Sequence, residues 1–270
     1  MTRQHSYAFP PPWHPLYAEL AMFLGMEHFR PEWCTDQDQK VFEEVKLYPD
    51  IASFYSQSNI LCYQNIAYFL HGWKRKAYVV LFQLGMGALT VLDYGCGGGH
   101  DGEWFLHAGF DVTFADLPGR PLDFCQWRLR NHGYEAPVLR IGEDPMPFCN
   151  IVWCFDVVEH LPEDEQCVLL DTLATCGNVV IVNLIEDRRA DGRIHYPVDR
   201  EKLIKYVHDA GAYVLQDIHT MDDGNRMSVL VYGRGVTWQK EGNVLVDVWA
   251  RNIPTVSEEE GHAAPSVPHS

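Results

Sequence analysis

The sequence predicts an α/β fold built on a doubly wound, seven-stranded, mostly parallel sheet. Short apolar strands alternate with helices of about ten to fifteen residues, which is typical of a parallel sheet wrapped by helices on both faces. The last two predicted strands have only a polar turn between them, so they should pair as a hairpin that contains one antiparallel strand. The predicted strands are 89–95, 110–116, 136–142, 149–156, 178–184, 212–220 and 226–234.

The regions before and after the sheet differ from it in composition. The segment 1–35 is rich in proline and aromatic residues, and we expect an extended arm of polyproline character. Helical periodicity and many aromatic side chains follow up to about residue 84, which predicts a helical lid. We therefore expect three parts: an arm and lid at 1–88, a ligand-binding sheet domain at 89–236, and an extension with a flexible end at 237–270.

The charge of the chain limits its partners. The formal net charge is −16 over 270 residues, which argues against a general nucleic-acid or anionic-membrane partner, because these are bound through Lys and Arg. The one tight basic cluster is Lys74-Arg75-Lys76, for which we expect a solvated helix face.

The cysteines indicate a reducing compartment. None of the eight forms a C-x-x-C pair, and several lie in apolar runs, as expected of buried thiols. No signal peptide is recognisable, and the longest apolar stretch, 77–92, is too short to span a bilayer comfortably. We expect a soluble, cytoplasmic protein, and the sequence leaves its oligomeric state open.

Glycines concentrate at the end of the first predicted strand, in "VLDYGCGGGH". A strand that enters a helix through glycines lets the backbone approach a ligand, as in Rossmann-like nucleotide-binding folds. The phosphate-binding pattern G-x-G-x-x-G fails here, because His100 stands where its third glycine is required. The actual pattern is D-x-G-x-G-x-G from Asp93, and Asp116 ends the next strand, where a carboxylate can bind a ribose diol. The alternative is a tight turn with Asp116 as a helix cap.

Four segments in order carry a family resemblance: "VLDYGCGGG", "VTFADL", "IGEDPMPF" and "CFDVVEHLPE". Together they resemble the class I S-adenosylmethionine-dependent methyltransferases, in the branch whose fourth strand leads into D/E-V-x-E-H-L. The resemblance covers about 90–235. It implies the Rossmann-like fold, S-adenosyl-L-methionine as the cofactor and a methyl-transfer activity, whereas the E-H-L segment says little about the acceptor.

The resemblance also implies cofactor contacts at the ends of the first four strands. Asp93 and the glycines would hold the methionine moiety, Asp116 the ribose hydroxyls, and Leu117 the adenine. An acidic residue after the third strand would face the adenine amino group, and both Glu143 and Asp144 are candidates. The predicted cofactor-binding residues are Asp93, Gly95, Cys96, Gly97, Gly99, Asp116, Leu117, Glu143, Asp144, Phe155 and Asp156.

Three residues are candidates for catalysis: His160 and Glu159 after the fourth strand, and His195 in the loop after the fifth. Methyl transfer from a sulfonium mainly requires alignment, and a general base is needed only when the acceptor keeps its proton. We take His195 as the leading base and His160 as its competitor. Glu159 and His160 could instead hold the loop at the strand end. For His100, His107, His132 and His208 we expect ordinary surface positions.

The predicted activity is methyl transfer to an oxygen or nitrogen of a small or carbohydrate-like acceptor. One alternative is a non-catalytic or structural protein that keeps the fold. Another is methylation of protein or RNA, including a metal-dependent RNA 2′-O-methyltransferase in which Asp156, Glu159, His160 and His195 would hold a divalent cation. Asp stands in place of the first Glu of that pattern, and the acidic chain is a poor match for RNA, so we expect no metal.

Overall fold

The computed structural model describes residues 14–35, 37–70, 74, 77–78, 81, 89–186, 194–222, 225–234, 239–241 and 244–246. The chain divides into two compact units, Met1–Gly235 and Val236–Ser270. Within the second unit, β8 (Gln239–Glu241) pairs antiparallel with β9 (Val244–Val246). The remaining description concerns the first unit.

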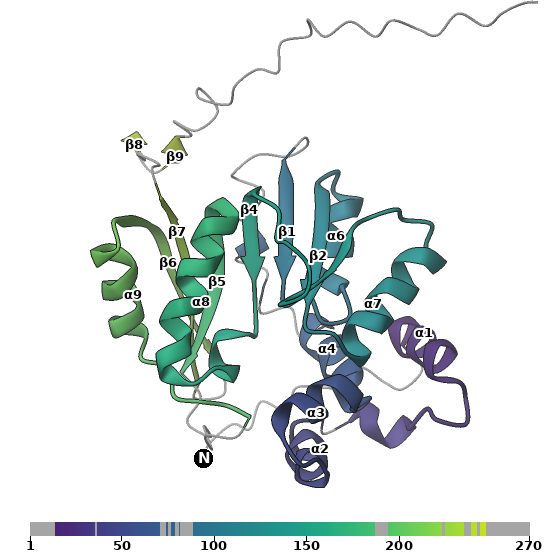
Figure 1. Cartoon of the computed structure of the whole chain (residues 1–270). Coiled ribbons are helices and arrows are strands. Elements are labelled where there is room, and N and C mark those ends of the chain that lie inside the picture. The colour runs from purple at the N-terminus through teal and green to yellow at the C-terminus, as the bar shows by residue number, and fades with distance from the viewer. Residues whose placement is uncertain are drawn as a thin grey trace, which may run out of the picture. The chain divides into compact units, whose positions relative to one another are not determined.

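The first unit is built on a seven-stranded sheet in the order β3-β2-β1-β4-β5-β7-β6 (Figure 1). All pairs from β3 to β5 are parallel, and β7 runs antiparallel to both β5 and β6. The predicted fold, with its hairpin and one antiparallel strand, is thus confirmed. The strands are β1 (Thr90–Tyr94), β2 (Asp111–Asp116), β3 (Val138–Arg140), β4 (Cys149–Cys154), β5 (Gly177–Glu186), β6 (Ala212–Asp222) and β7 (Asn225–Arg234).

Both faces of the sheet are covered by helices. On one face, Leu92, Val152 and Val180 join an apolar core with residues of α8 (Glu163–Cys176) and α9 (Arg200–Asp209). Because successive residues of a strand point to opposite faces, Asp93 and Trp153 lie on the other face. That face carries α6 (His100–His107), and the sheet is therefore covered on both sides.

The N-terminal region is helical from residue 15, so the expected extended arm is wrong for residues 15–24, and residues 1–13 lie outside the described part. Pro15 occupies the first turn of α1 (Pro15–Leu24), where its missing N–H costs nothing, and His14 caps that turn by accepting from the Leu16 amide at 3.3 Å. The other helices of this region are η1 (Pro31–Cys34), α2 (Gln37–Glu44), η2 (Val45–Leu47), α3 (Ile51–Gln57) and α4 (Ile60–Leu70).

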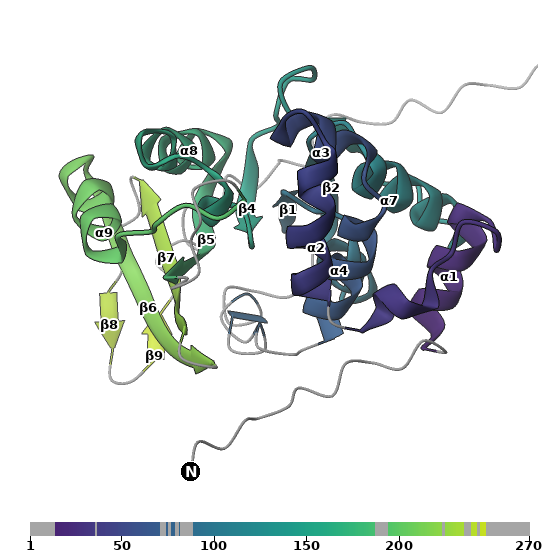
Figure 2. The ribbon, with the colours of Figure 1, turned by 90° about the horizontal axis from the view of Figure 1, so that it is seen from below.

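These N-terminal helices bury an apolar core of their own, which includes Tyr17, Leu20, Tyr63 and Ile66 and reaches Phe124 on α7 (Arg120–Asn131). Figure 2 shows α2, α3 and α4 lying across the end of β1 and β2. Contact there is close, because a Cβ added at Gly119, after β2, would lie 2.7 Å from the carbonyl oxygen of Tyr55. The helices therefore cover the carboxyl ends of the strands.

The structure also bears on the predictions for the cysteines and for membrane-spanning segments. All eight cysteines are free, and six of them are buried, which agrees with the predicted reduced thiols. In the described part of the chain, no helix has the length and apolar character needed to cross a membrane.

Candidate active site

The glycine turn after β1 needs its glycines for conformation and for space. Gly95, Gly97 and Gly99 have φ of 75°, 53° and 73°, in the left-handed region that other residues rarely adopt. A Cβ at Gly97 would lie 2.6 Å from Oδ1 of Asn65, on α4. The turn therefore leads from β1 into α6 directly beneath an N-terminal helix.

Asp116, at the end of β2, lies against this turn. Its Oδ2 accepts a hydrogen bond from the Gly97 amide at 2.5 Å, and its Oδ1 accepts from the Leu117 amide at 2.6 Å. Burial raises the pKa of Asp116 to about 6, and the two amide hydrogen bonds oppose that shift. The structure thus brings the predicted ribose acid and the glycine turn into contact, with Leu117 half exposed beside them.

The two acidic residues after β3 are exposed and engaged with Arg140. Asp144 accepts from the Arg140 amide at 2.8 Å, and Glu143 pairs with the Arg140 guanidinium at 3.4 Å. Neither contact distinguishes the two as partners of an adenine, so both stay candidates.

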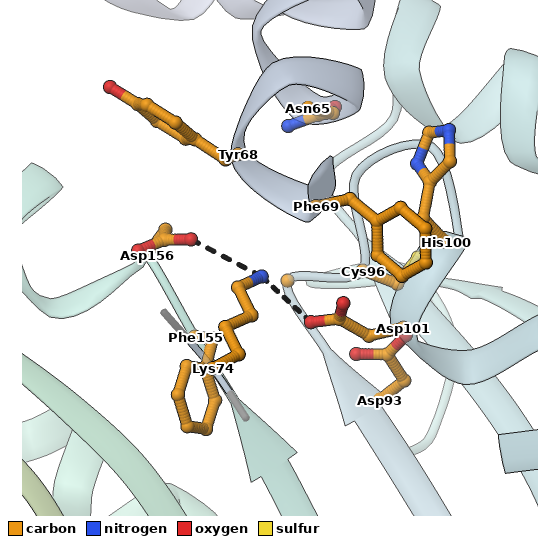
Figure 3. A pocket seen from close by; sticks show the side chains of 11 residues that line it. Asn65, Tyr68, Phe69, Lys74, Asp93, Cys96, His100, Asp101, Phe155 and Asp156 are labelled. Atoms are coloured by element: carbon orange, nitrogen blue, oxygen red, sulfur yellow. Dashed lines mark hydrogen bonds and ion pairs between the residues drawn. The ribbon is translucent and has the colours of Figure 1, made fainter. Parts of the chain in front are cut away.

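A pocket opens beside the glycine turn (Figure 3). Five of the predicted cofactor-binding residues line it, namely Asp93, Gly95, Cys96, Phe155 and Asp156. Its other lining residues are Asn65, Tyr68, Phe69, Lys74, His100 and Asp101.

Lys74 is buried at the cavity, so the prediction of a solvated helix face is wrong for this residue; Arg75 and Lys76 lie outside the described part. Its Nζ lies 2.7 Å from Asp101 Oδ2 and 3.4 Å from Asp156 Oδ2 (Figure 3). Burial alone would lower the pKa of Lys74, but the carboxylates of Asp101 and Asp156 outweigh it and raise that pKa. Pairing with these carboxylates makes the burial of Lys74 possible. The run of three basic residues in the sequence does not reveal this pairing.

The carboxyls around Lys74 are held in different ways. Asp101 also accepts hydrogen bonds from the Tyr78 hydroxyl at 2.7 Å and from the Trp153 indole at 3.1 Å. Asp93 accepts from the Gly102 amide at 3.0 Å, and burial, followed by the charge of Asp101, raises its pKa well above the usual range. The cluster thus contains more carboxyls than cations and can accept a further positive group.

Asp156 follows β4 in a left-handed conformation, with φ of 59°. Asn183 on β5 holds it there, because its Oδ1 accepts from the Asp156 amide at 2.7 Å and its Nδ2 donates to Asp156 Oδ1 at 2.9 Å. Burial raises the pKa of Asp156, against the opposing charge of Lys74. A strained residue fixed by a neighbouring strand is a common feature of ligand sites.

His160 and His195 come together after β4 and β5, with ring centroids 5.0 Å apart. His160 Nδ1 lies 2.9 Å from the carbonyl oxygen of Ile194 and must donate to it, so Nε2 carries the lone pair. Burial, followed by the charge of His195, lowers the pKa of His160 to about 4. Tyr55 lies edge-on to His160, and Phe42 lies edge-on to His195.

Glu159 is buried beside this pair, and its carbonyl oxygen accepts from the Tyr196 amide at 2.7 Å. This contact ties the segment after β4 to the segment that carries His195.

Within the described part, no three His, Cys, Asp or Glu side chains are grouped so that they could hold a metal ion. Asp156 instead faces Lys74 and Asn183.

Sequence reasoning missed Asn65 and Lys74, and its surface position for His100 is wrong. His100 is 5% exposed, and its ring lies 5.5 Å from that of Phe69, measured between centroids. The sequence feature that could have indicated a site position for His100 is its place directly after the glycine motif. The positions of Asn65 and Lys74 depend on how the N-terminal helical region meets the sheet, which no local pattern encodes.

The residues of the cavity fit S-adenosylmethionine as a bound group. Gly95 presents bare backbone to the cavity, and the acid cluster suits a ligand with positive charge. In the described structure, Asn65 Oδ1 and His100 Nε2 are buried without a hydrogen-bond partner, which leaves polar positions for a ligand.

No family model matches the chain. Among curated proteins it is similar to ubiquinone biosynthesis O-methyltransferases. The protein from Bordetella avium is 34% identical over 87 residues, which are 29% of this chain and 34% of the relative. The protein from Photorhabdus laumondii is 28% identical over 153 residues, which are 52% of this chain and 62% of the relative. The chain thus matches between about a third and three fifths of these relatives' length.

Among solved structures, the fold resembles magnesium protoporphyrin IX methyltransferase from Synechocystis PCC 6803 with bound S-adenosylmethionine. The TM-score is 0.53 at 16% identity, over 80% of this chain and 97% of the other. This likeness establishes the fold, and the matched sequences are those of methyltransferases. The chain therefore has the α/β Rossmann-like methyltransferase fold, and the curated proteins to which it is similar are O-methyltransferases.

Proposed function

We propose that the chain transfers a methyl group from S-adenosylmethionine to an oxygen of a small-molecule acceptor, with nitrogen as the second choice. The observation that carries the proposal is the position of two groups at one edge of the sheet. The glycine turn and Asp116 follow β1 and β2, and the pair of His160 and His195 follows the neighbouring strands β4 and β5. In a parallel sheet, ligands bind at this edge.

The choice of acceptor rests on charge and on the relatives. A net charge of −16 is unfavourable for binding the phosphates of RNA, whereas it does not hinder a small molecule without phosphate groups. The curated relatives are named for O-methyl transfer in ubiquinone biosynthesis, which supports an oxygen acceptor. The aromatic rings of Phe42 and Tyr55 beside the two histidines suit an acceptor with a flat or apolar body.

When bound, the cofactor supplies an electrophilic methyl group, whose transfer breaks the carbon–sulfur bond and leaves a neutral thioether. The task left to the chain is to align the acceptor and remove its proton. His160 is suited to the second task, because its Nδ1–H is engaged by Ile194 and its Nε2 is unprotonated at any pH well above about 4. His195, 5.0 Å away, then orients the acceptor or shares the proton.

The test uses S-adenosylmethionine labelled in its methyl group, with a panel of small phenols, carboxylic acids and amines. We expect label to pass to a phenol or another oxygen acceptor, and His160→Gln to reduce that transfer about 100-fold or more, as loss of a general base does. Calorimetry with S-adenosylhomocysteine should show that this variant keeps its cofactor affinity, because His160 lies on the acceptor side. His208→Gln, on the exposed end of α9, is the matched control.

Several outcomes would contradict the proposal. Binding of a nicotinamide dinucleotide, with no heat from either S-adenosyl compound, would remove the cofactor assignment. Cofactor binding without transfer to any acceptor would favour the non-catalytic alternative. Transfer only to RNA or protein would replace the acceptor class, and full activity of His160→Gln would remove its role as the base.

A further inference from the structure

Two buried polar atoms of the cavity wall come from outside the D-x-G-x-G-x-G pattern itself. Asn65 extends from α4 and His100 begins α6, and both line the cavity with the predicted cofactor-binding residues. Asn65 Oδ1 and His100 Nε2 have no hydrogen-bond partner within the described part of the chain. Figure 3 shows Asn65 at the top and His100 at the upper right of the cavity, with Asp156 at the left and Lys74 below it.

The surroundings of His100 would suit an apolar side chain better than an imidazole. Its ring lies 5.5 Å from that of Phe69 and 6.1 Å from that of Phe124, between centroids. A buried polar atom without a partner is costly, and in a folded protein it calls for an explanation. A ligand that enters this cavity and pairs with both atoms supplies one.

The chemistry of the two atoms restricts what such a ligand offers. Asn65 Oδ1 only accepts hydrogen bonds, so it requires a donor. Burial, followed by the charges of Arg128 and Lys74, lowers the pKa of His100 well below its usual range, so its imidazole is neutral and can donate from Nε2. The ligand should therefore present a donor and an acceptor close together. An α-amino-acid head, with its ammonium and carboxylate, has this arrangement.

We infer that Asn65 and His100 bind the amino-acid head of the cofactor, with its ammonium donating to Asn65 Oδ1 and its carboxylate accepting from His100 Nε2. The inference rests on the proposed function, since it assigns residues to the same cofactor. It gives α4 a direct part in binding, because Asn65 already lies against the glycine turn at Gly97. The neighbouring carboxyls add a negative environment that suits the ammonium.

The test compares two ligands that differ only at this head. S-Adenosylhomocysteine carries the amino-acid group, whereas 5′-methylthioadenosine keeps the adenosine and the thioether without it. For Asn65→Leu and for His100→Leu, calorimetry should show the dissociation constant of S-adenosylhomocysteine rising by about tenfold or more, as expected for a lost hydrogen bond to a charged group. The dissociation constant of 5′-methylthioadenosine should change by less than about twofold.

Matched controls and a stability measurement separate binding from folding. Asn131→Leu and His107→Leu change the same residue types at exposed positions of α7 and α6 and should leave both ligands unaffected. Without ligand, Asn65→Leu and His100→Leu should unfold at the same temperature as the wild type or higher, because an apolar group replaces an unpartnered polar one. If one of the two variants fails to fold, the other still provides the comparison of ligands.

The outcomes distinguish this inference from the proposed function. If the wild type binds neither ligand, the proposed function fails. If the wild type binds S-adenosylhomocysteine and both variants bind it equally well, the inference is overturned and water fills these positions instead. Equal losses for both ligands also overturn it, because the residues would then support the turn and not the amino-acid head.

Discussion

Two buried charged clusters flank the glycine turn, and they differ in how completely their groups are paired. In the first, Arg128 on α7 donates to Glu19 Oε2 at 2.8 Å, to the Gly98 carbonyl oxygen at 2.8 Å and to Glu103. His132 contacts both glutamates, which closes a ring of four side chains. The second is the cavity cluster of Asp93, Asp101, Asp156 and Lys74, next to the unpartnered atoms of Asn65 and His100.

The difference separates a structural use of buried charge from a use in binding. The Arg128 cluster joins α1, α6 and α7 to a carbonyl of the glycine turn, and its charged groups satisfy one another. In the cavity cluster, burial raises the carboxyl pKa values of Asp93 and Asp156, which shows that these groups lack sufficient compensation. Paired charges hold the fold together, whereas we propose that the incompletely compensated ones belong to the ligand site.

The largest expected effect is on the paired cluster. Arg128→Met should lower the free energy of unfolding by about 3–5 kcal/mol, because it leaves Glu19 and Glu103 buried without their cation. Urea denaturation at neutral pH measures this change. A loss below about 1 kcal/mol would show that the cluster resembles a surface ion pair, and the contrast between the two regions would disappear.

An effect of opposite sign is expected at Asp116. Its folded-state pKa of about 6 is raised above the unfolded value, so its contribution to stability is present below about pH 4 and is lost as the pH rises through about 6. Asp116→Asn should therefore stabilise the ligand-free protein at pH 8, by on the order of 2 kcal/mol, with the gain shrinking toward pH 5. Urea denaturation at both pH values gives the difference.

The same variant should weaken cofactor binding, because a carboxylate binds a ribose diol better than an amide does. A variant that is less stable than the wild type at pH 8 would mean that the hydrogen bonds from Gly97 and Leu117 outweigh the cost of burial. Asp116 would then belong with the paired charges and not with the ligand-facing ones.

The smallest effect is expected on the surface. Lys202 and Glu163 pair at 2.5 Å, with side chains 50% and 60% exposed. Lys202→Ala should leave the urea midpoint unchanged within experimental scatter, because an exposed pair gains little over solvation in water. A clear loss would show that pairing stabilises this protein regardless of burial.

Local patterns predict the sheet, the hairpin and the glycine turn, because alternation, spacing and backbone conformation act within a few residues. Pro15 shows a limit even at this scale, since proline before an apolar run can begin a helix as well as prevent one. The cavity residues are harder to predict, because Lys74, Asn65 and His100 gain their roles from contacts made across the fold. Three adjacent basic residues suggest a solvent-exposed helix face. Lys74 can nevertheless be buried, because its ammonium group pairs with the carboxylates of Asp101 and Asp156.

Gly119 has a consequence for recognising related chains. The backbone of α3 packs so closely against Gly119 that a side chain does not fit there. Any Cβ at this position would lie 2.7 Å from the Tyr55 carbonyl oxygen and 2.9 Å from the Ser56 Cα. Backbone atoms cannot rotate away as a side chain can, so replacement of Gly119 by any residue with a Cβ is incompatible with this packing. Across an alignment, glycine at this position should accompany the helical region that precedes the sheet. Divergent homologues that share only the sheet should accept other residues there, which would make position 119 a marker of this subgroup.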